Sequence, residues 1–379
     1  MGKWSIRFRH LFRLTDDVGI LEHGHYLLPR RGEGYTTDDN ARALLTVLTW
    51  ADLLPPSSLR DRLLALSERY LAFLAWAARE DGRFHNNFSY AREKEPEHPS
   101  DDCDARALYA LAHARYKMPH QAHRELSREL YLKALPHAFH FKAPRAMAYA
   151  LATVGTLLET DPGDLSQTER TLSFQLLETL SSRLLRLYEE NHDQHWRWFE
   201  PLLTYANALL PWGLWRAQML LDNEAVRHAA KESLEFLIGV MTTGDPPHLR
   251  PVGNDGWGDR TKMASWDQQP LEIFKIALAA SAAWEQTGES RYWQVIQLAH
   301  GWFYGQNTRG VMMINEAEGA AYDGLTPNGP NANAGAEALL SYLMTEAIWI
   351  AAQKKISHRL LLNAEREDTV TIEEETQSL

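Results

Sequence analysis

The sequence predicts an all-α protein, an (α/α)6 toroid in which six helical hairpins form a single domain. The first indication is a repeat: TDDNARALL at residues 37–45 matches DDCDARALY at residues 101–109 at five of nine positions without a gap. The second is an alternation of amphipathic and apolar helical patterns at intervals of roughly 40 to 65 residues. The third is the lack of any long run with the period-two alternation of β-strands. Helix pairs that cannot bury their apolar faces alone must pack side by side, and six such pairs can close into a ring.

Six segments are expected to form the inner ring, because each begins with polar residues and continues as a long apolar, Ala-rich stretch. The two matched copies provide the first and second. A third, fainter copy reads PRAMAYAL at residues 144–151, where Arg145 and Ala146 keep the Arg–Ala pair but the acidic residue is missing. The remaining three have the same polar start and long apolar stretch but do not repeat the sequence of the first two copies: residues 204–220, 267–284 and 333–351.

The segments between them have one polar face and are expected to form the outer ring. Apolar residues such as Leu63 and Leu66 recur there at three- and four-residue steps, with charged residues between them, as in a helix with one solvated face. The toroid is expected to span residues 1–355, and the acidic segment 356–379, which lacks helical apolar spacing, is expected to be a mobile tail. The outer helices are predicted at residues 59–77, 123–139, 165–190, 223–243 and 291–306, with the twelfth helix at 6–20.

The composition is that of a globular protein, with 45% apolar and 23% charged residues in a chain of 379. A formal net charge of -11 without any Lys/Arg-rich run argues against nucleic-acid or anionic-membrane binding and favours a neutral or polar substrate. Cys103 is the single cysteine, which excludes an internal disulfide and suits a reducing compartment. No apolar stretch has the length of a signal peptide near the N-terminus, and none reaches the roughly 18 residues of a membrane span, so a cytoplasmic protein is expected.

The polar starts of the predicted inner helices are rich in acidic residues. In a toroid the inner helices point the same way, so their starts gather at one mouth of the ring. Side chains that are distant in the sequence would then meet in one basin: Asp38, Asp39, Asn40, Asp101, Asp102, Asp104 and Asp267.

Two structural roles compete with a functional one for these acids. An Asp or Asn at a helix start commonly caps unpaired backbone N–H groups, and DQQPLE at residues 267–272 suits a capped start with Pro270 at the first helical position. Capping needs one residue per helix, however, whereas two starts carry two or three acids. Arg42 and Arg106 follow Asp38 and Asp102 by four residues, so each pair can also form an ion pair on one helical face.

Loops that lead to the same mouth mix aromatic, acidic and amide side chains. They are DGRFHNNFSY at residues 81–90, the segment 192–207 and the segment 251–270. Sugar sites need this mixture, because pyranose rings lie on aromatic faces while their hydroxyls form hydrogen bonds. The predicted substrate-binding residues are Tyr35, Asn40, Arg42, Phe84, His85, Asn86, Asp101, Asp104, Arg106, Trp198, Tyr205, Asn207, Asn254, Trp257, Arg260, Gln268, Gln269, Asn333 and Glu337.

A catalytic basin of this kind would place two carboxyl groups on either side of a glycosidic bond, one as acid and one as base or nucleophile. The spacing in sequence leaves a retaining and an inverting outcome open. The candidates for these carboxyl groups are Asp38, Asp39, Asp102, Asp267 and Glu200.

Histidines or a bound cofactor could carry the chemistry in place of the carboxyl groups. His23 and His25 lie close together and His98 lies near three acids, but no HExxH or other metal-ligand pattern occurs, so no metal site is expected. No GxGxxG or Walker element occurs either, and no cofactor is expected. A sugar epimerase that abstracts a proton with His25 or His85 is the third functional alternative.

The motifs GYTTDDNARALL, DGRFHNNFSY, SDDCDARALYAL, LTYANALLP, WDQQPLE and NANAGAEALLSYL together resemble the six-hairpin glycosidase-like domains of bacteria, over about residues 20–350. Such domains occur alone, or joined to or encoded near glycosyltransferases, and their activities include hydrolases, lyases, phosphorylases and epimerases. The resemblance implies a carbohydrate-active protein, with a glycan or small glycoside as ligand and a glycosyltransferase as a candidate partner. We expect a glycoside hydrolase-like enzyme, and the main alternative is a non-catalytic saccharide-binding or scaffold domain.

Two positions depart from the pattern of these domains. Ala206 stands where an Asp before Asn is more common, and Ala338 stands where a hydroxyl residue is usual. If either missing group were catalytic, the protein would be a weakened or purely binding version.

Overall fold

The computed structural model describes residues 6–160 and 163–377, with side chains up to residue 357. Its described part contains twelve α-helices in alternating inner and outer positions, which confirms the predicted (α/α)6 toroid. The inner helices are α2 (Thr37–Leu53), α4 (Asp101–Lys117), α6 (Pro144–Thr160), α8 (Leu209–Gln218), α10 (Pro270–Thr287) and α12 (Ala336–Gln377). The outer helices are α1 (Arg9–Leu14), α3 (Ser58–Ala77), α5 (Gln121–Ala134), α7 (Gln167–Asn191), α9 (Glu224–Met241) and α11 (Ser290–Phe303).

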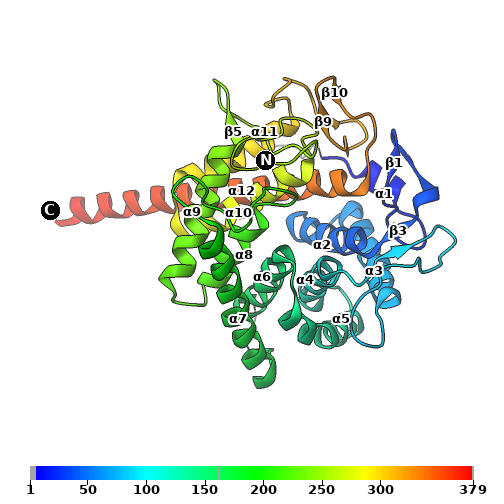
Figure 1. The fold of residues 1–379 in the computed structure, drawn as a ribbon. Helices are drawn as coiled ribbons and strands as arrows, with labels where there is room; N and C mark the ends of the chain where they lie inside the picture. Colours follow the sequence, from blue (N-terminus) through cyan, green and yellow to red (C-terminus); the bar gives the residue numbers. More distant parts are fainter. Residues whose placement is uncertain (1–5, 161–162, 378–379) are drawn as a thin grey trace.

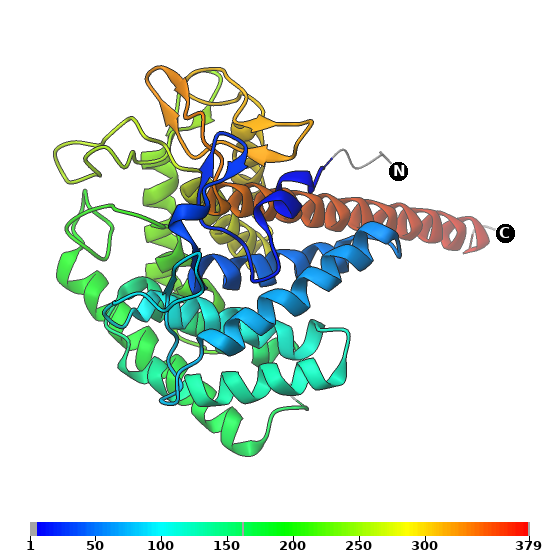
Figure 2. The same ribbon diagram turned by 90° about the vertical axis from the view of Figure 1, so that its right-hand side faces the viewer.

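The ring is closed. Each inner helix contacts the next one along the chain, and the last, α12, contacts the first, α2. Figures 1 and 2 show the hairpins following one another around the molecule in colour order, from blue through green to orange. The short helix α1 packs against α12 and so occupies the twelfth position assigned to it. No helix in the described part of the chain is long and apolar enough to cross a membrane.

Four helices differ most from their predicted bounds. The helix α1 covers only Arg9–Leu14 of the predicted residues 6–20. The helix α8 begins at Leu209 rather than at residue 204, and α5 gives way after Ala134 to the 3-10 helix η2 (Leu135–His140). The backbone of α12 continues as a helix through residues 356–377, where a tail without helical structure was expected. The predicted mobility of that segment stays a prediction.

Hydroxyl residues rather than the clustered acids cap the first two inner helices. The side chain of Thr36 accepts a hydrogen bond from the backbone of Asp39 at the start of α2, and Ser100 does the same for Cys103 at the start of α4. Asp38 and Asp102 therefore lie in the first turn, where the helix dipole favours them, with their carboxylates free for other partners. Pro270 is the first residue of α10, as predicted.

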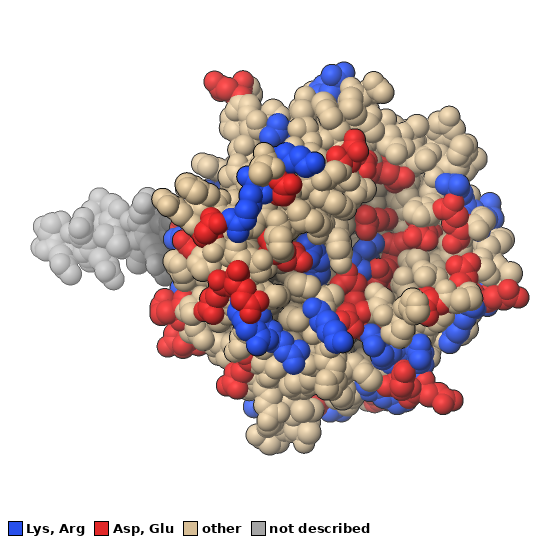
Figure 3. All heavy atoms as spheres, viewed as in Figure 1, with Lys and Arg blue, Asp and Glu red and all other residues tan. Residues whose placement is uncertain are grey.

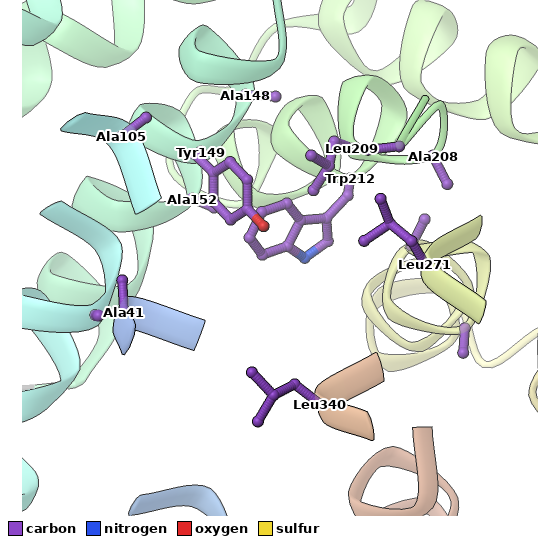
Figure 4. Packing of buried hydrophobic residues seen from close by; sticks show 14 of the residues in the cluster. Ala41, Ala105, Ala148, Tyr149, Ala152, Ala208, Leu209, Trp212, Leu271 and Leu340 are labelled. Atoms are coloured by element: carbon purple, nitrogen blue, oxygen red, sulfur yellow. The ribbon is translucent and has the colours of Figure 1, made fainter. Parts of the chain in front are cut away.

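Small residues let the inner helices approach closely. Ala41, Ala105 and Ala148 are buried between neighbouring inner helices, as Figure 4 shows. At the contact of α6 and α8, a Cβ added to Gly213 would lie 2.6 Å from the Cα of Ala148. The Ala-rich sequence of the inner segments is thus a requirement of the ring's packing.

Ten short strands form five antiparallel pairs in the described residues, and none of them was predicted. They are β1 (Gly24–His25) with β2 (Leu28–Pro29), β3 (Tyr35–Thr36) with β4 (Asn87–Phe88), β5 (Thr242–Thr243) with β6 (His248–Leu249), β7 (Ile314–Asn315) with β8 (Ala320–Ala321), and β9 (Leu325–Thr326) with β10 (Gly329–Pro330). In Figure 1, β1, β3, β9 and β10 lie far from the C-terminal end of α12. They lie on the side of the ring where the inner helices begin. The pairing of Thr36 with Asn87 holds the 81–90 loop against the start of α2.

Candidate active site

Arginines link the starts of the first, second and last inner helices. Arg106 of α4 forms an ion pair with Asp38 of α2 and lies 3.6 Å from Asp102 of its own helix. Arg42 of α2 reaches Glu337 of α12 at 3.0 Å. Asp38 and Asp102, two of the side chains predicted to converge, are therefore neighbours at the starts of α2 and α4.

The same rim continues through the other three inner helices. The hydroxyl of Tyr205, just before α8, donates to Asp102 at 2.6 Å. Arg145 of α6 donates to both carboxylate oxygens of Glu200, at 2.9 and 2.7 Å, and to the backbone oxygen of Tyr205. Glu272 of α10 accepts hydrogen bonds from the backbone and side-chain amides of Asn207, at 3.2 and 3.1 Å. A continuous polar network thus joins helix starts that lie far apart in sequence.

A cavity of about 290 Å³ opens at this mouth. Figure 3 shows acidic side chains, in red, gathered in a hollow to the right of the centre of that view. Six predicted site residues line the cavity: Asp38, Asp39, Arg42, Asn86, Gln269 and Glu337. It is also lined by residues outside the predicted set: Glu22, His23, Thr36, Asn87, Pro270, Leu271, Asp323, Gly335 and Ala338.

Asp38 is held in its ionised form. Burial alone would raise the pKa of its carboxyl group, but the guanidinium groups of Arg106 and Arg42 outweigh burial and hold the pKa below its usual range. One carboxylate oxygen, Oδ2, accepts from Arg106, whereas the buried Oδ1 has no hydrogen-bond partner in the described structure. The carboxylate of Asp38 thus lines the cavity in its charged form, while its unpaired Oδ1 is itself covered by neighbouring atoms.

Glu22, which was missed at the sequence level, has the opposite protonation behaviour. Burial, reinforced by the nearby carboxylate of Asp39, raises the pKa of Glu22 to about 7. Its backbone oxygen accepts from Ala336 at 2.9 Å, which fixes it beside the start of α12. Glu22 lies in a loop before β1, away from any helix start. The clusters of acids at the starts of the inner helices therefore do not include it.

Two further acids have environments that favour protonation. Asp39 is buried and accepts from Thr36 and, at 2.7 Å, from Arg42. Burial raises its pKa despite the pairing with Arg42. Burial also raises the pKa of Asp323, which accepts from the backbone of Gly335 at 2.6 Å. These two carboxyl groups mainly hold the start of α2 and the start of α12 in place.

The predicted aromatic platform for a sugar is not present in this cavity. Phe84 and Trp198 are buried in the core, and the buried Tyr35 uses its hydroxyl to donate to Asp16 at 2.6 Å. None of the described residues that line the cavity is aromatic. Each of these three rings is covered by the fold, and their contact with a sugar stays a prediction.

Several predicted polar residues instead have structural roles. Asn40 joins the backbone of Ile20 to that of Thr36. Asp101 and Asp104 both pair with Arg83. The buried Gln268 donates to the backbone of Ser265, and Asn333 accepts from the backbone of Tyr26. These partners account for the polar groups without a ligand.

The remaining candidates lie at or beyond the edge of the site. Glu200 and Asp102 belong to the rim network but do not line the cavity, and Asp267 adopts a left-handed backbone (φ 55°) just before α10. Outside the cavity lining, Asn254 and Trp257 lie on the 251–268 loop, and Arg260 of that loop pairs with Asp193.

His85, a candidate for proton transfer, and His23, a neighbour of the mouth, lie in different places in the described structure. The ring of His85 lies 3.3 Å from Glu97, and its Nε2 donates to the backbone oxygen of Asn87 at 3.0 Å, away from the cavity lining. His23 is the one histidine among the described lining residues. Within the described chain, no group of three or more His, Cys, Asp and Glu side chains is arranged to hold a metal ion.

The fold is that of known carbohydrate enzymes. No protein-family model and no curated protein matches the sequence. A sugar epimerase from a ruminal bacterium is similar, with a TM-score of 0.66 and 13% identity over 91% of this chain and 96% of that one. A cellobiose 2-epimerase from Bacillus thermoamylovorans B4167 gives 0.67 and 12% over 90% and 96%. The GH76 α-mannanase BT2949 of Bacteroides thetaiotaomicron gives 0.62 and 9% over 92% and 95%.

These similarities show that the chain has the six-hairpin glycosidase-like fold. They do not decide between hydrolysis and epimerisation, because both activities are named among the similar structures. The glycosyltransferase partner expected from the sequence finds no support in them.

Proposed function

We propose that this protein is a glycoside hydrolase-like enzyme that cleaves a glycosidic bond in the mouth cavity. One observation carries the proposal: two carboxyl groups that line the same cavity have pKa values displaced in opposite directions, Glu22 upward to about 7 and Asp38 downward. Paired carboxyl groups whose environments separate their pKa values are the usual mark of an acid and a base in one site.

The two groups take complementary roles in this proposal. Near pH 7 a large fraction of Glu22 is protonated, so it can donate a proton to the leaving oxygen of the glycoside. Asp38 stays ionised and acts as the base toward water or as the nucleophile at the anomeric carbon. Arg106 keeps Asp38 charged and oriented from behind.

The cavity suits a small neutral sugar. Its volume of about 290 Å³ is close to the lower end of the range of small-molecule sites. Asn86, Asn87 and Gln269 offer amide groups on its wall, and such groups pair with sugar hydroxyls. A ligand with several negative charges is disfavoured by the surrounding carboxylates. The similar structures, which are named as sugar epimerases and an α-mannanase, support the same substrate class.

Saccharide binding without turnover is the second candidate. It is favoured by the pairing of three of the predicted catalytic acids with arginines: Asp38 with Arg106, Asp39 with Arg42, and Glu200 with Arg145. Epimerisation is favoured by the similar structures, but a two-histidine mechanism is not supported, because His23 is the one histidine on the described cavity wall.

The test is turnover of a panel of disaccharides and aryl glycosides by the purified protein. With disaccharides as substrates, Glu22→Gln and Asp38→Asn should each lower kcat/KM by about 100-fold or more, while Glu95→Gln, on an exposed loop residue, should leave it unchanged. Thermal unfolding checks that each variant is folded. Sugar binding without products would contradict hydrolysis in favour of the binding role, and conversion of a free sugar into its epimer would contradict both.

The pH dependence of that turnover tests the assignment of the acid. Because Glu22 must be protonated to donate, kcat/KM should fall as the pH rises through about 7. An aryl glycoside with a very acidic leaving group needs no proton, so its hydrolysis should survive Glu22→Gln and lose this alkaline decline. A decline that remains in Glu22→Gln would assign the acid to another residue.

A further inference from the structure

A groove, here called the outer groove, lies along the outer helix α3 on the outside of the ring. It has a volume of about 510 Å³ and shares no lining residue with the mouth cavity in the described part of the chain. It follows α3 from Ala65 to Trp76, which is about 16 Å at the helical rise of 1.5 Å per residue. Asp17, after α1, and Arg92, in the turn at residues 89–93, also line it. Figure 2 shows α3, in lighter blue than α2, on the face turned toward the viewer.

Trp76 provides an aromatic surface in the outer groove. It is 38% exposed, more than any other tryptophan that the structure describes. The rings of Phe88 and Phe73 contact it, with centroids at 4.3 and 5.5 Å, so its orientation is fixed although part of the ring is open to solvent. A large aromatic ring normally gains from burial. An indole that is held in place and exposed is suited to stack against the C–H face of a pyranose.

Arg92 occupies a position where glycine is usual. Its backbone N–H closes the turn after β4 by donating to Ser89 at 2.9 Å, and its φ is 67°. A residue with a Cβ is strained in this left-handed conformation. The ion pair with Asp17, at 2.7 Å, offsets little of that strain, because the two side chains are 58% and 71% exposed and exposed pairs contribute little to stability. Stability therefore does not account for this arginine, whereas a ligand in the groove does.

Charged groups of both signs line the outer groove. Arg69 and Arg92 can donate hydrogen bonds to a ligand, and Asp17 and Glu68 can accept them. An anionic ligand would meet the two carboxylates, and a cationic ligand would meet the two guanidinium groups. The hydroxyls of a neutral sugar both donate and accept, so they can pair with groups of either sign.

The β3–β4 pair separates the outer groove from the mouth cavity. Thr36 and Asn87, which are opposite each other in this pair, line the mouth cavity. The adjacent Tyr35 and Phe88 point to the other face, because side chains alternate along a strand. Their ring centroids lie 6.1 and 5.1 Å from that of Phe73, which lines the outer groove. A ligand in the groove is therefore separated from the mouth by one pair of strands.

We propose that the outer groove is a second saccharide-binding site. It takes a neutral oligosaccharide, with one sugar ring on Trp76 and hydroxyl groups paired with Arg69, Arg92, Asp17 and Glu68. The length of the groove along α3 suits a ligand of more than one ring. Binding there does not depend on catalysis at the mouth.

Calorimetry with hexasaccharides tests the proposal on the unaltered chain. The neutral probes are cellohexaose, mannohexaose, xylohexaose and maltohexaose, and the charged probes are the hexamers of galacturonate and of glucosamine. At least one neutral probe should bind, about tenfold more tightly than either charged probe. No binding of any neutral probe, or tighter binding of a charged probe, would overturn the proposal.

Variants locate the bound hexasaccharide. Trp76→Ala should weaken its binding by about tenfold, and so should Ala72→Glu, at an exposed position of the groove that leaves the indole in place. Phe174→Ala, at an exposed aromatic residue of α7, is the matched control and should bind like the parent. In NMR spectra, the indole N–H signal that is absent from Trp76→Ala should shift when the probe is added to the parent. Undiminished binding in both groove variants would place the sugar elsewhere and contradict the proposal.

Arg92→Gly separates ligand binding from a structural role. Because glycine relieves the backbone strain, the unfolding temperature should not fall, whereas the hexasaccharide should bind about fivefold more weakly. A lower unfolding temperature with unchanged binding would assign Arg92 to the fold and contradict its role in the groove. Glu22→Gln should keep binding in the groove, so a failure of the mouth as an active site is distinguishable from a failure of this site.

Discussion

The starts of α2 and α4 carry nearly the same sequence and make the same kind of contact, but with different neighbours. In each, an arginine five residues after the first position of the repeat pairs with an acid of its own helix and with an acid of the preceding inner helix. Arg106 pairs with Asp102 and reaches back to Asp38 of α2. Arg42 pairs with Asp39 and reaches back to Glu337 of α12. The repeat therefore encodes a contact between hairpins as well as a helix.

The difference between the copies decides which of them can form a site. Asp39 has Cys103 as its counterpart, so only the first copy adds a second carboxylate to the mouth. Arg145, in the faint third copy, pairs with Glu200 of a loop and does not reach back to an acid of α4. The contact that Asp102 of α4 receives from farther along the chain comes from the hydroxyl of Tyr205. The copies of the repeat thus have similar sequences but different partners, and the acid-lined cavity lies at the first copy.

The largest expected effect comes from removing the arginine of the second copy. Arg106→Met leaves the partly buried Asp38 without its arginine partner and should lower the free energy of unfolding by about 3 kcal/mol. Arg42→Met should cost less, because the pKa of Asp39 is already raised and Glu337 is 41% exposed. Urea unfolding at pH 7 measures both. An equal or greater loss for Arg42→Met would break the comparison.

The same pair has a predictable pH dependence. Because the folded-state pKa of Asp38 lies below its unfolded value, its stabilising contribution is present above the usual Asp range and is lost as the pH falls through the folded-state pKa. The difference in the free energy of unfolding between the parent and Arg106→Met should therefore become smaller as the pH is lowered.

A smaller effect is expected from exchanging the matched residues Asn40 and Asp104. Asn40→Asp turns a buried donor to the backbone of Thr36 into an acceptor and should destabilise by about 2–3 kcal/mol. Asp104→Asn keeps the acceptor for Phe84 and loses the charged contact to the partly exposed Arg83, at about 1 kcal/mol. Thermal unfolding of both single variants ranks them, and a larger loss for Asp104→Asn would contradict the assignment.

The smallest effect concerns the caps that the two helices share. Thr36→Ala and Ser100→Ala should each cost about 1 kcal/mol in urea unfolding, with Thr36→Ala the larger because its hydroxyl also donates to Asp39 at 3.1 Å. If Asp102→Ala lowered stability by more than Ser100→Ala with an unchanged rim network, the acid would have a capping role that the structure does not show.

The positions of the inner helices and the convergence of their acids were predictable because both depend on local patterns. Long apolar stretches after polar starts identified all six inner helices, and the shift of α8 to Leu209 has a local cause. Ala206, just before it, has a left-handed backbone (φ 48°), and the turn that it forms presents Tyr205 to Asp102. No period in the sequence announces such a turn.

The composition of the cavity wall was only partly predictable. Glu22 and Asp323 lie on loops without a repeat, and they reach the mouth because the chain folds back beside the start of α12. Phe84 and Trp198 occur in polar segments that suggested exposed rings, yet both are buried. Burial of a large aromatic ring stabilises the fold strongly, so such a ring is often buried even when its neighbours in the sequence are polar.

The sequence by itself determined that this chain forms a ring of helical hairpins with acids at one mouth, since helical period and capping are set by residues a few positions apart. The tertiary structure alone decided which of those acids stay ionised. Charge depends on burial and on partners such as Arg106 and Asp38, which are 68 positions apart in the chain, and such pairs exist only once the ring has closed.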